Sequence, residues 1–286
     1  MNAAQPEPGR DAAIALLEWY RDAGIDVFVD EAPRDRFAET RAQSAARGGR
    51  RSAPSARPAA PAPNEPAATF ATSRAAVPDD IAIADARERA RSASSLAELQ
   101  AALDGFESCN LRRSAKSTVF GDGSESAELM FVGEAPGREE DIAGVPFVGR
   151  SGQLLDRMLA AIGLERQNVR VTNSVPWRPP GNRPPTPAET QICLPFVQRH
   201  IELVRPKILV CLGSPAAKAI LASEEGILRI RGRWTTYSFG LGETDTIAAT
   251  AMLHPAYLLR QPAQKKLAWR DLLALKARLA ENTAAD

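Results

Sequence analysis

The feature that most constrains the fold is an apolar run that stops at a glycine, LMFVG at residues 129–133. Consecutive apolar residues without alternation predict a strand buried on both faces, as in a parallel sheet. The next residues complete GEAPG at 133–137, where two glycines and a proline favour a tight turn over a helix. We expect the polar segment that follows, up to Phe147, to be a loop. A strand that ends in such a turn predicts an open α/β sheet, in which ligands bind beyond the carboxyl ends of the strands.

Strand-like and helix-like patterns alternate along the rest of the chain. Further apolar runs predict strands at residues 169–175, 208–212, 234–239 and 246–252. Apolar spacing and helix-start signals predict helices at residues 95–103, 152–162, 186–204, 214–221 and 264–280. This alternation favours an α/β fold with a mostly parallel central sheet covered by helices on both faces.

The N-terminal part of the chain has a different composition. Residues 1–37 include an amphipathic pattern at 11–23, which predicts a short helix that could dock on the main domain or on a protein partner. Residues 38–75 are rich in Ala, Pro and Arg and predict a disordered linker. That linker is either a solvated spacer or a weak, salt-sensitive tether to phosphates. The main domain is expected to span residues 76–286.

Charge and composition exclude several classes of protein. The 36 basic and 35 acidic residues give a net charge of +1, so the overall charge of the chain does not indicate a nucleic-acid partner. No apolar run is long enough to span a bilayer, and residues 1–10 lack the features of a signal peptide. Three cysteines do not favour a disulfide framework. We therefore expect a cytoplasmic protein without membrane contacts.

Residues that could carry chemistry follow the predicted strands. Glu134 follows the first strand, Asn173 lies near the end of the next, and His254 follows the strand at 246–252. An Asn side chain offers a donor and an acceptor in one plane, which suits the edge of a nucleobase, and the ring of Phe147 could stack on such a ligand. Each residue alone also has a plain structural explanation, such as a turn Asn or a core Phe. The second histidine, His200, lies on a predicted helix and is expected at the surface or its boundary.

Four motifs together carry a family resemblance. They are GEAPG at 133–137, PFVG at 146–149, the segment 172–183 with TN and RPPGNR, and HPAYLLR at 254–260. In this order they resemble family 4 of the uracil-DNA glycosylase superfamily, from Cys109 to the C-terminus. The resemblance implies a three-layer α/β/α domain. It also implies a DNA repair enzyme that flips uracil out of DNA and hydrolyses its N-glycosidic bond to leave an abasic site. The expected protein is a monomer whose partner is uracil-containing DNA.

The resemblance also implies roles for individual residues. Phe147 would stack on the uracil, and Asn173 would bind its polar edge. His254 would donate a hydrogen bond to a carbonyl oxygen of the base, where negative charge develops as the bond breaks. Glu134 would position water or stabilise the cationic sugar. Other positions would support the site or bind the substrate, with the loop 254–260 inserting into the duplex: Gly133, Ala135, Glu140, Asn182, Tyr257 and Arg260.

The cysteines depart from the family pattern. Typical members hold an iron–sulfur cluster with four cysteines, and here Cys109 and Cys193 match two of these positions. Phe106 and Trp177 stand at the other two, while the third cysteine, Cys211, lies in an apolar strand and is expected in the core. We therefore expect no iron–sulfur cluster and no metal, with the two aromatic side chains filling the space.

Three functions stay open on the sequence alone. The first is a hydrolytic uracil-DNA glycosylase. The second is a relative that traps uracil-containing DNA covalently, but such proteins carry an insertion after PFVG that residues 150–154 lack. The third is a non-catalytic DNA-binding protein, which the presence of Glu134, Asn173 and His254 disfavours.

Overall fold

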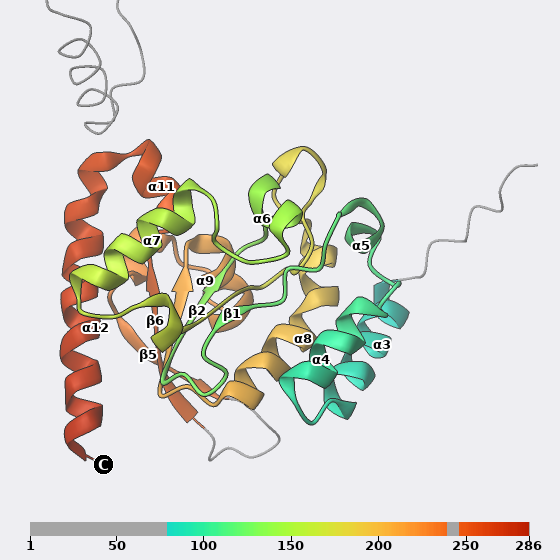
Figure 1. Cartoon of the computed structure of the whole chain (residues 1–286), viewed down its shortest axis with the longest axis horizontal. Coiled ribbons are helices and arrows are strands. Elements are labelled where there is room, and N and C mark those ends of the chain that lie inside the picture. Colours follow the sequence, from blue (N-terminus) through green and yellow to red (C-terminus); the bar gives the residue numbers. More distant parts are fainter. Residues whose placement is uncertain (1–78, 239–245, 286) are drawn as a thin grey trace, which may run out of the picture. The chain divides into compact units, whose positions relative to one another are not determined.

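The computed structural model describes residues 79–238 and 246–285 (Figure 1). The expected helix at 11–23, the linker at 38–75 and the start of the main domain at residue 76 lie outside these ranges. None of the helices in the described ranges is long and apolar enough to cross a membrane.

A six-stranded sheet organises the described chain, in the order β1-β3-β2-β4-β6-β5. Its strands are β1 (Asp122–Gly123), β2 (Leu129–Gly133), β3 (Arg170–Asn173), β4 (Ile208–Leu212), β5 (Trp234–Ser238) and β6 (Thr246–Met252). The four inner strands are parallel, and the two edge strands β1 and β5 are antiparallel to their neighbours. The mostly parallel sheet expected from the sequence is confirmed. The short edge strand β1 was not predicted, because two residues carry no periodicity.

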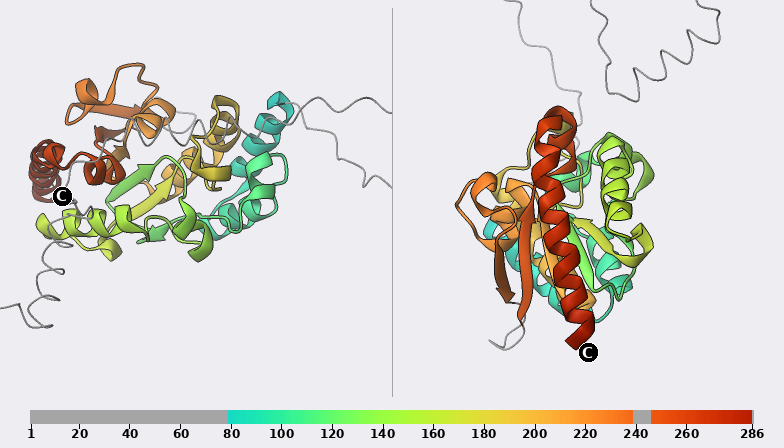
Figure 2. Two further views of the ribbon diagram at one scale, coloured as in Figure 1. Left: turned by 90° about the horizontal axis from the view of Figure 1, so that it is seen from above. Right: turned by 90° about the vertical axis from the view of Figure 1, so that its left-hand side faces the viewer.

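Helices cover both faces of this sheet (Figures 1 and 2). The longer helices are α3 (Asp79–Ser92), α4 (Leu96–Asp104), α7 (Arg150–Ala161), α8 (Pro187–Val204), α9 (Ser214–Leu221) and α12 (Lys265–Ala285). The shorter ones are α5 (Asn110–Ser114), α6 (Arg138–Ala143), α10 (Ile227–Ile230), α11 (Pro255–Arg260) and the 3₁₀ turns η1 (Arg166–Asn168), η2 (Pro180–Asn182) and η3 (Pro262–Gln264).

The alternation of side chains along the strands builds two separate cores. In β2, Met130 and Val132 point to the face covered by α3, α4, α8 and α9. Leu129 and Phe131 point to the opposite face, which α7, α11 and α12 cover. All four side chains are buried, as expected of an inner parallel strand. The fold is therefore a three-layer α/β/α arrangement.

Short helices form where the sequence suggested loops. The segment between Gly137 and Phe147 contains α6, whose first turn is capped by the Glu140 carboxylate on the Gly137 N–H. The segment 106–120, for which the sequence predicted no element, contains α5. The loop expected at 254–260 is the helix α11, with Pro255 at its first position. Each helix is so short that its apolar period cannot be read from the sequence.

His200 also differs from the expectation, because it is buried rather than at the surface. Its ring stacks on Phe120 with 4.4 Å between the centroids, and its Nε2 accepts a hydrogen bond of 2.9 Å from Arg170 Nε. Burial, and then the charge of Arg170, hold the pKa of His200 well below its usual range. This histidine is therefore a neutral acceptor for a buried arginine.

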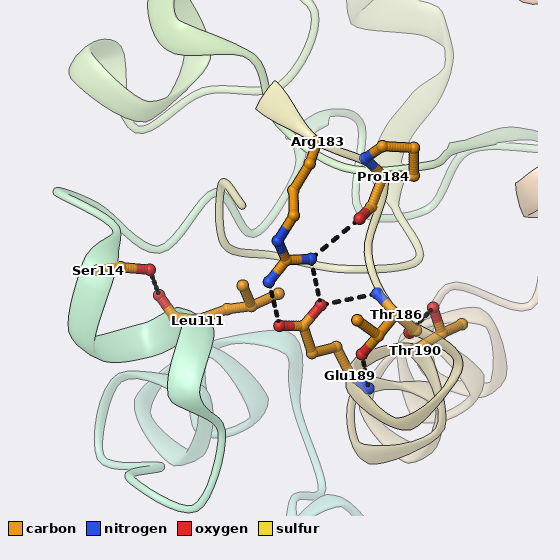
Figure 3. A network of polar contacts seen from close by, with 7 residues as sticks. All are labelled: Leu111, Ser114, Arg183, Pro184, Thr186, Glu189 and Thr190. Atoms are coloured by element: carbon orange, nitrogen blue, oxygen red, sulfur yellow. Dashed lines mark hydrogen bonds and ion pairs between the residues drawn. The ribbon is translucent and has the colours of Figure 1, made fainter. Parts of the chain in front are cut away.

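The start of α8 follows its sequence signal closely (Figure 3). The Thr186 hydroxyl accepts a hydrogen bond of 3.2 Å from the Glu189 N–H, and the Glu189 carboxylate accepts one of 2.7 Å from the Thr186 N–H. The same carboxylate takes two bonds from the Arg183 guanidinium, at 2.6 and 2.8 Å. The capping box thus also anchors the loop that precedes α8.

We expect Thr186→Ala to lower the free energy of unfolding by about 1 kcal/mol, since the Glu189 N–H loses its capping acceptor. Urea denaturation followed by circular dichroism measures this loss. Thr190→Ala is the matched control, because the Thr190 hydroxyl only donates back to the Thr186 carbonyl. A loss no greater for Thr186→Ala than for Thr190→Ala would contradict the capping role.

Candidate active site

The candidate site begins at the carboxyl ends of β2 and β3, where Gly133 and Asn173 pair in register. A Cβ atom on Gly133 would lie 2.4 Å from Asn173 Oδ1 and 2.7 Å from Phe147 Cζ. The missing side chain of Gly133 therefore allows the amide and the ring to approach the end of β2 together. Three of the expected site residues, Gly133, Asn173 and Phe147, meet at this point.

Phe147 reaches this position through an unusual backbone conformation. Its φ angle is +54°, in the left-handed region, and its side chain is buried. Such a conformation costs a residue with a Cβ atom roughly 1–2 kcal/mol. The ring faces that of His254, with 5.6 Å between the centroids and 27° between the planes. This conformation directs the ring towards the other candidate residues.

His254 follows β6 and caps the N-terminus of α11. Its Nδ1 accepts a hydrogen bond of 3.1 Å from the Ala256 N–H, which places the imidazole proton on Nε2. Burial, and then the charge of Arg260, lower the pKa of His254 to about 4. At neutral pH the ring is therefore an uncharged Nε2–H donor. Gly213 lies behind it, since a Cβ there would be 3.1 Å from the His254 Cβ.

Glu134 stands in the turn after β2, next to Ala135, and both are half-buried. The Glu134 carbonyl accepts hydrogen bonds from the Val175 N–H at 3.0 Å and from the Ser174 hydroxyl at 2.8 Å. These bonds tie the turn to the chain that follows β3. Burial raises the pKa of the Glu134 carboxyl.

Glu140 connects the turn after β2 to the segment that carries Phe147. One carboxylate oxygen accepts from the Gly137 N–H and the other from the Gly149 N–H, each at 3.0 Å. The side chain is buried, so these two bonds fix the relative positions of both segments. Glu140 is a structural clamp at the edge of the site.

Two further residues that contact the segments of the site, Asp141 and Gly152, belong to none of the four sequence motifs. Asp141 accepts backbone bonds from Lys116 at 2.8 Å and Ser117 at 3.2 Å, which joins α6 to the loop before β1. Gly152 lies so close to Phe147 that a Cβ there would be 1.7 Å from the Phe147 carbonyl oxygen. A glycine inside a helical pattern was the available signal for Gly152, since it often marks a close approach.

The remaining substrate residues of the sequence analysis lie further out. Asn182 is exposed in η2, and its Oδ1 accepts a bond of 2.6 Å from Arg178 Nε. Tyr257 is half-buried and Arg260 is exposed, both on α11. The structure thus brings four of the expected residues into one group: Gly133, Asn173, Phe147 and His254. The other three lie outside this group: Asn182, Tyr257 and Arg260.

The two aromatic residues at the cysteine positions pack together. Phe106 and Trp177 are fully buried and stack with 6.1 Å between the centroids and 8° between the planes. Phe196 meets Phe106 edge-on at 5.1 Å. The indole N–H of Trp177 donates to the Thr118 hydroxyl at 3.2 Å. The expected aromatic packing therefore exists, and it joins the loop before β1 to the loop after β3.

The surroundings do not fit a four-thiolate iron–sulfur cluster. Cys109 and Cys193 are both free and buried, and the Cys193 side chain lowers the pKa of the Cys109 thiol, whereas the third cysteine, Cys211, is buried in β4. The cavity that borders Cys193 has a volume of about 10 Å³, roughly the space for one water molecule. In the described part of the chain, no group of three or more His, Cys, Asp or Glu side chains is arranged to hold a metal ion. Cys109 and Cys193 could supply two of the four thiolates that a cubane needs, and packed aromatic rings stand at the other two positions.

The lowered pKa of His254 predicts a pH-dependent stability. Because the unfolded imidazole titrates near its ordinary pKa of about 6.5 and the folded one near 4, the unfolded state binds more protons between these values. The free energy of unfolding should therefore be highest above about pH 6.5 and fall towards about pH 4. Urea denaturation across this window measures the slope, and His254→Gln should reduce it. A His254 resonance that titrates near pH 6.5 in the folded protein would contradict this prediction.

Comparison with known proteins agrees with this geometry. The sequence model of the family described as the Uracil DNA glycosylase superfamily matches residues 120–273. The Type-4 uracil-DNA glycosylase of Archaeoglobus fulgidus is 42% identical over 159 residues, which cover 54% of this chain and 78% of that protein. The Type-4 uracil-DNA glycosylase of Saccharolobus solfataricus is 38% identical over 181 residues, which cover 60% of this chain and 81% of that protein. The Type-4 uracil-DNA glycosylase of Thermotoga maritima is 38% identical over 153 residues, which cover 53% of this chain and 77% of that protein. Since the family match spans more than half of the chain, this protein belongs to the uracil-DNA glycosylase superfamily and is similar to its Type-4 members.

Proposed function

We propose that this protein is a DNA repair enzyme that excises uracil from DNA by hydrolysing its N-glycosidic bond. The observation that carries the proposal is the meeting of Asn173 and the Phe147 ring at Gly133, with a neutral His254 facing that ring. These groups supply an amide edge, an aromatic face and a hydrogen-bond donor at the carboxyl edge of a parallel sheet. Together they suit a planar base with polar edges.

The proposed substrate is uracil flipped out of the duplex. Leaving the stack costs the base a few kcal/mol, and stacking on an aromatic ring returns roughly 1–3 kcal/mol. Phe147 is the stacking surface in this proposal. The Asn173 amide pairs with the imide edge of uracil, which presents a carbonyl oxygen and an N–H side by side.

His254 is the proposed donor to the departing base. Breaking the glycosidic bond places negative charge on the uracil oxygens, so a fixed Nε2–H binds the transition state more strongly than the ground state. The Ala256 N–H holds the ring in this tautomer. Because the imidazole stays uncharged at neutral pH, the donor does not depend on protonation in that range.

Glu134 is the proposed carboxylate on the sugar side. Positive charge develops on the sugar as the base leaves, and a nearby carboxylate stabilises this charge or orients the attacking water. Burial raises the pKa of this group, which makes it a better acceptor for a proton of that water. The two charged ends of the breaking bond are thereby matched by a carboxylate and a neutral donor.

Further parts of the proposal concern the surroundings of the site. Residues 76–286 form the proposed catalytic domain, and α11 is the proposed element that contacts the duplex through Tyr257 and Arg260. Asn182 is assigned a supporting role from the loop before α8. The enzyme is proposed to act as a cytoplasmic monomer, with residues 11–23 as a candidate contact for a protein partner.

We expect His254→Ala to lower the single-turnover rate of uracil excision by about two to three orders of magnitude, the loss typical of one leaving-group donor. The rate is measured with a uracil-containing oligonucleotide and saturating protein. The product of the unaltered protein also tests the function: free uracil supports hydrolysis, whereas a stable adduct or a bound but uncleaved DNA would overturn it.

His200→Gln is the control, because it removes the other histidine from the buried face against Phe120. It should lower stability but leave the excision rate of the folded protein nearly unchanged. An effect of His254→Ala below about fivefold would remove His254 from the leaving-group role.

Absence of the iron–sulfur cluster is also part of the proposal, because Phe106 and Trp177 fill two of its four positions. Trp177→Ala should lower the free energy of unfolding on the order of 3 kcal/mol by leaving a cavity beside Phe106. The double variant Cys109→Ser with Cys193→Ser should be tolerated far better, as thermal denaturation can measure. Purified protein should carry no iron. Stoichiometric iron in protein purified without oxygen, lost in the double variant, would refute this assignment.

A further inference from the structure

An arginine outside the recognised motifs binds the backbone of the segment that carries Phe147. Arg166, in η1, donates from one terminal nitrogen to the Phe147 carbonyl at 2.8 Å and from the other to the Pro146 carbonyl at 3.3 Å. Its side chain retains 20% exposure, so both bonds are largely shielded from water. The guanidinium therefore binds two consecutive backbone carbonyls of this segment.

Carboxylates hold the guanidinium in place. Asp156, on α7, accepts from Arg166 at 2.7 and 2.8 Å, and Asp122, on β1, lies 3.6 Å from it. An arginine held by two carboxylates loses little further side-chain entropy when it binds the carbonyls. The position of Arg166 is thus set by elements of the sheet and of α7.

The bound carbonyl belongs to a residue in a costly backbone conformation. A left-handed, non-glycine residue persists only where several contacts determine it. Three contacts do so here: Arg166 binds the Phe147 carbonyl, Gly152 leaves room for that carbonyl, and Glu140 holds the Gly149 N–H at 3.0 Å. Without the Arg166 guanidinium, the Phe147 carbonyl would lose one fixed hydrogen-bond donor.

We propose that Arg166 is a positioning residue for base recognition, acting through Phe147. It keeps the Phe147 backbone left-handed, and this conformation presents the ring beside Asn173 and His254. This inference rests on the proposed function, since it gives the ring its task of stacking on the flipped uracil. Arg166 itself touches neither the base nor the sugar in this arrangement.

Arginine suits this role better than lysine because its donors form a planar fork. Two terminal nitrogens can bind two neighbouring carbonyls while Nε and one terminal nitrogen bind Asp156. A lysine ammonium at the same place could bind one carbonyl and one carboxylate. Arg166→Lys should therefore restore part of what Arg166→Gln loses.

A double-mutant cycle between Arg166 and Phe147 tests the proposal. Single-turnover excision is measured for the unaltered protein, Arg166→Gln, Phe147→Ala and the double variant. We expect Arg166→Gln to slow excision about tenfold when Phe147 is present and less than about twofold when Phe147 is replaced, because its effect passes through the ring. Arg166→Lys should slow excision about threefold. The affinity for undamaged duplex should stay unchanged in all variants, since no base is flipped there.

Arg199→Gln is the matched control. Arg199 also binds a backbone carbonyl, that of Ala93 at 2.8 and 3.0 Å, and a carboxylate, Glu202 at 2.8 Å. It joins α8 to the chain after α3 on the face of the sheet opposite Phe147. This variant should lose stability in thermal denaturation without slowing excision by the folded protein.

The possible outcomes separate this inference from the proposed function. If the unaltered protein releases uracil but Arg166→Gln slows excision equally with and without Phe147, Arg166 does not act through the ring and the inference fails alone. An unchanged rate in Arg166→Gln would overturn it as well. If the unaltered protein releases no uracil, the proposed function fails, and the inference falls with it.

Discussion

The site depends on a close approach at one backbone position. At Gly133 the strand β2 ends without a side chain, and the Asn173 amide and the Phe147 ring both occupy the space that a Cβ would need. The parallel register of β2 and β3 brings Asn173 there, whereas Phe147 arrives through a strained turn. A larger residue at position 133 would have to displace one of the two groups. The geometry of the candidate site is thus set by the end of a core strand together with the left-handed backbone at Phe147.

Burial then shifts the pKa values of two groups around this point. It lowers the pKa of His254 and raises that of Glu134, so both shifts favour the uncharged form of the group. For His254 the consequence is a neutral donor whose tautomer is fixed by the Ala256 N–H. A neutral donor avoids burying a cation beside Arg260, yet still stabilises the negative charge that forms on a departing base. Burial of the site therefore keeps His254 in the uncharged form that the proposed chemistry uses.

The sequence predicted those parts of the structure that local patterns determine. The apolar strands and the capping box of Thr186 and Glu189 formed as expected, because each depends on neighbours within a few residues. Arg166 and Asp141 escaped prediction, since each binds backbone groups about 20 or more residues away that no local pattern identifies. His200 was misplaced for the same reason: its burial follows from Arg170 on β3, a partner 30 residues earlier. The sequence therefore identified the motif residues of the site, but not the residues that hold its backbone through long-range hydrogen bonds.

The stacked pair Phe106 and Trp177 suggests how two loops can stay connected without four metal-binding thiolates. The pair links the chain before β1 to the chain after β3, and α8 adds Phe196 and Cys193 to the same core. A cluster would hold these elements through a few directional bonds, whereas packed rings hold them through many weak contacts whose strength depends on complementary shape. The loop after β3 also supplies the Val175 and Ser174 bonds to the Glu134 carbonyl. Aromatic packing beside Cys193 therefore supports the turn that positions the proposed catalytic carboxylate.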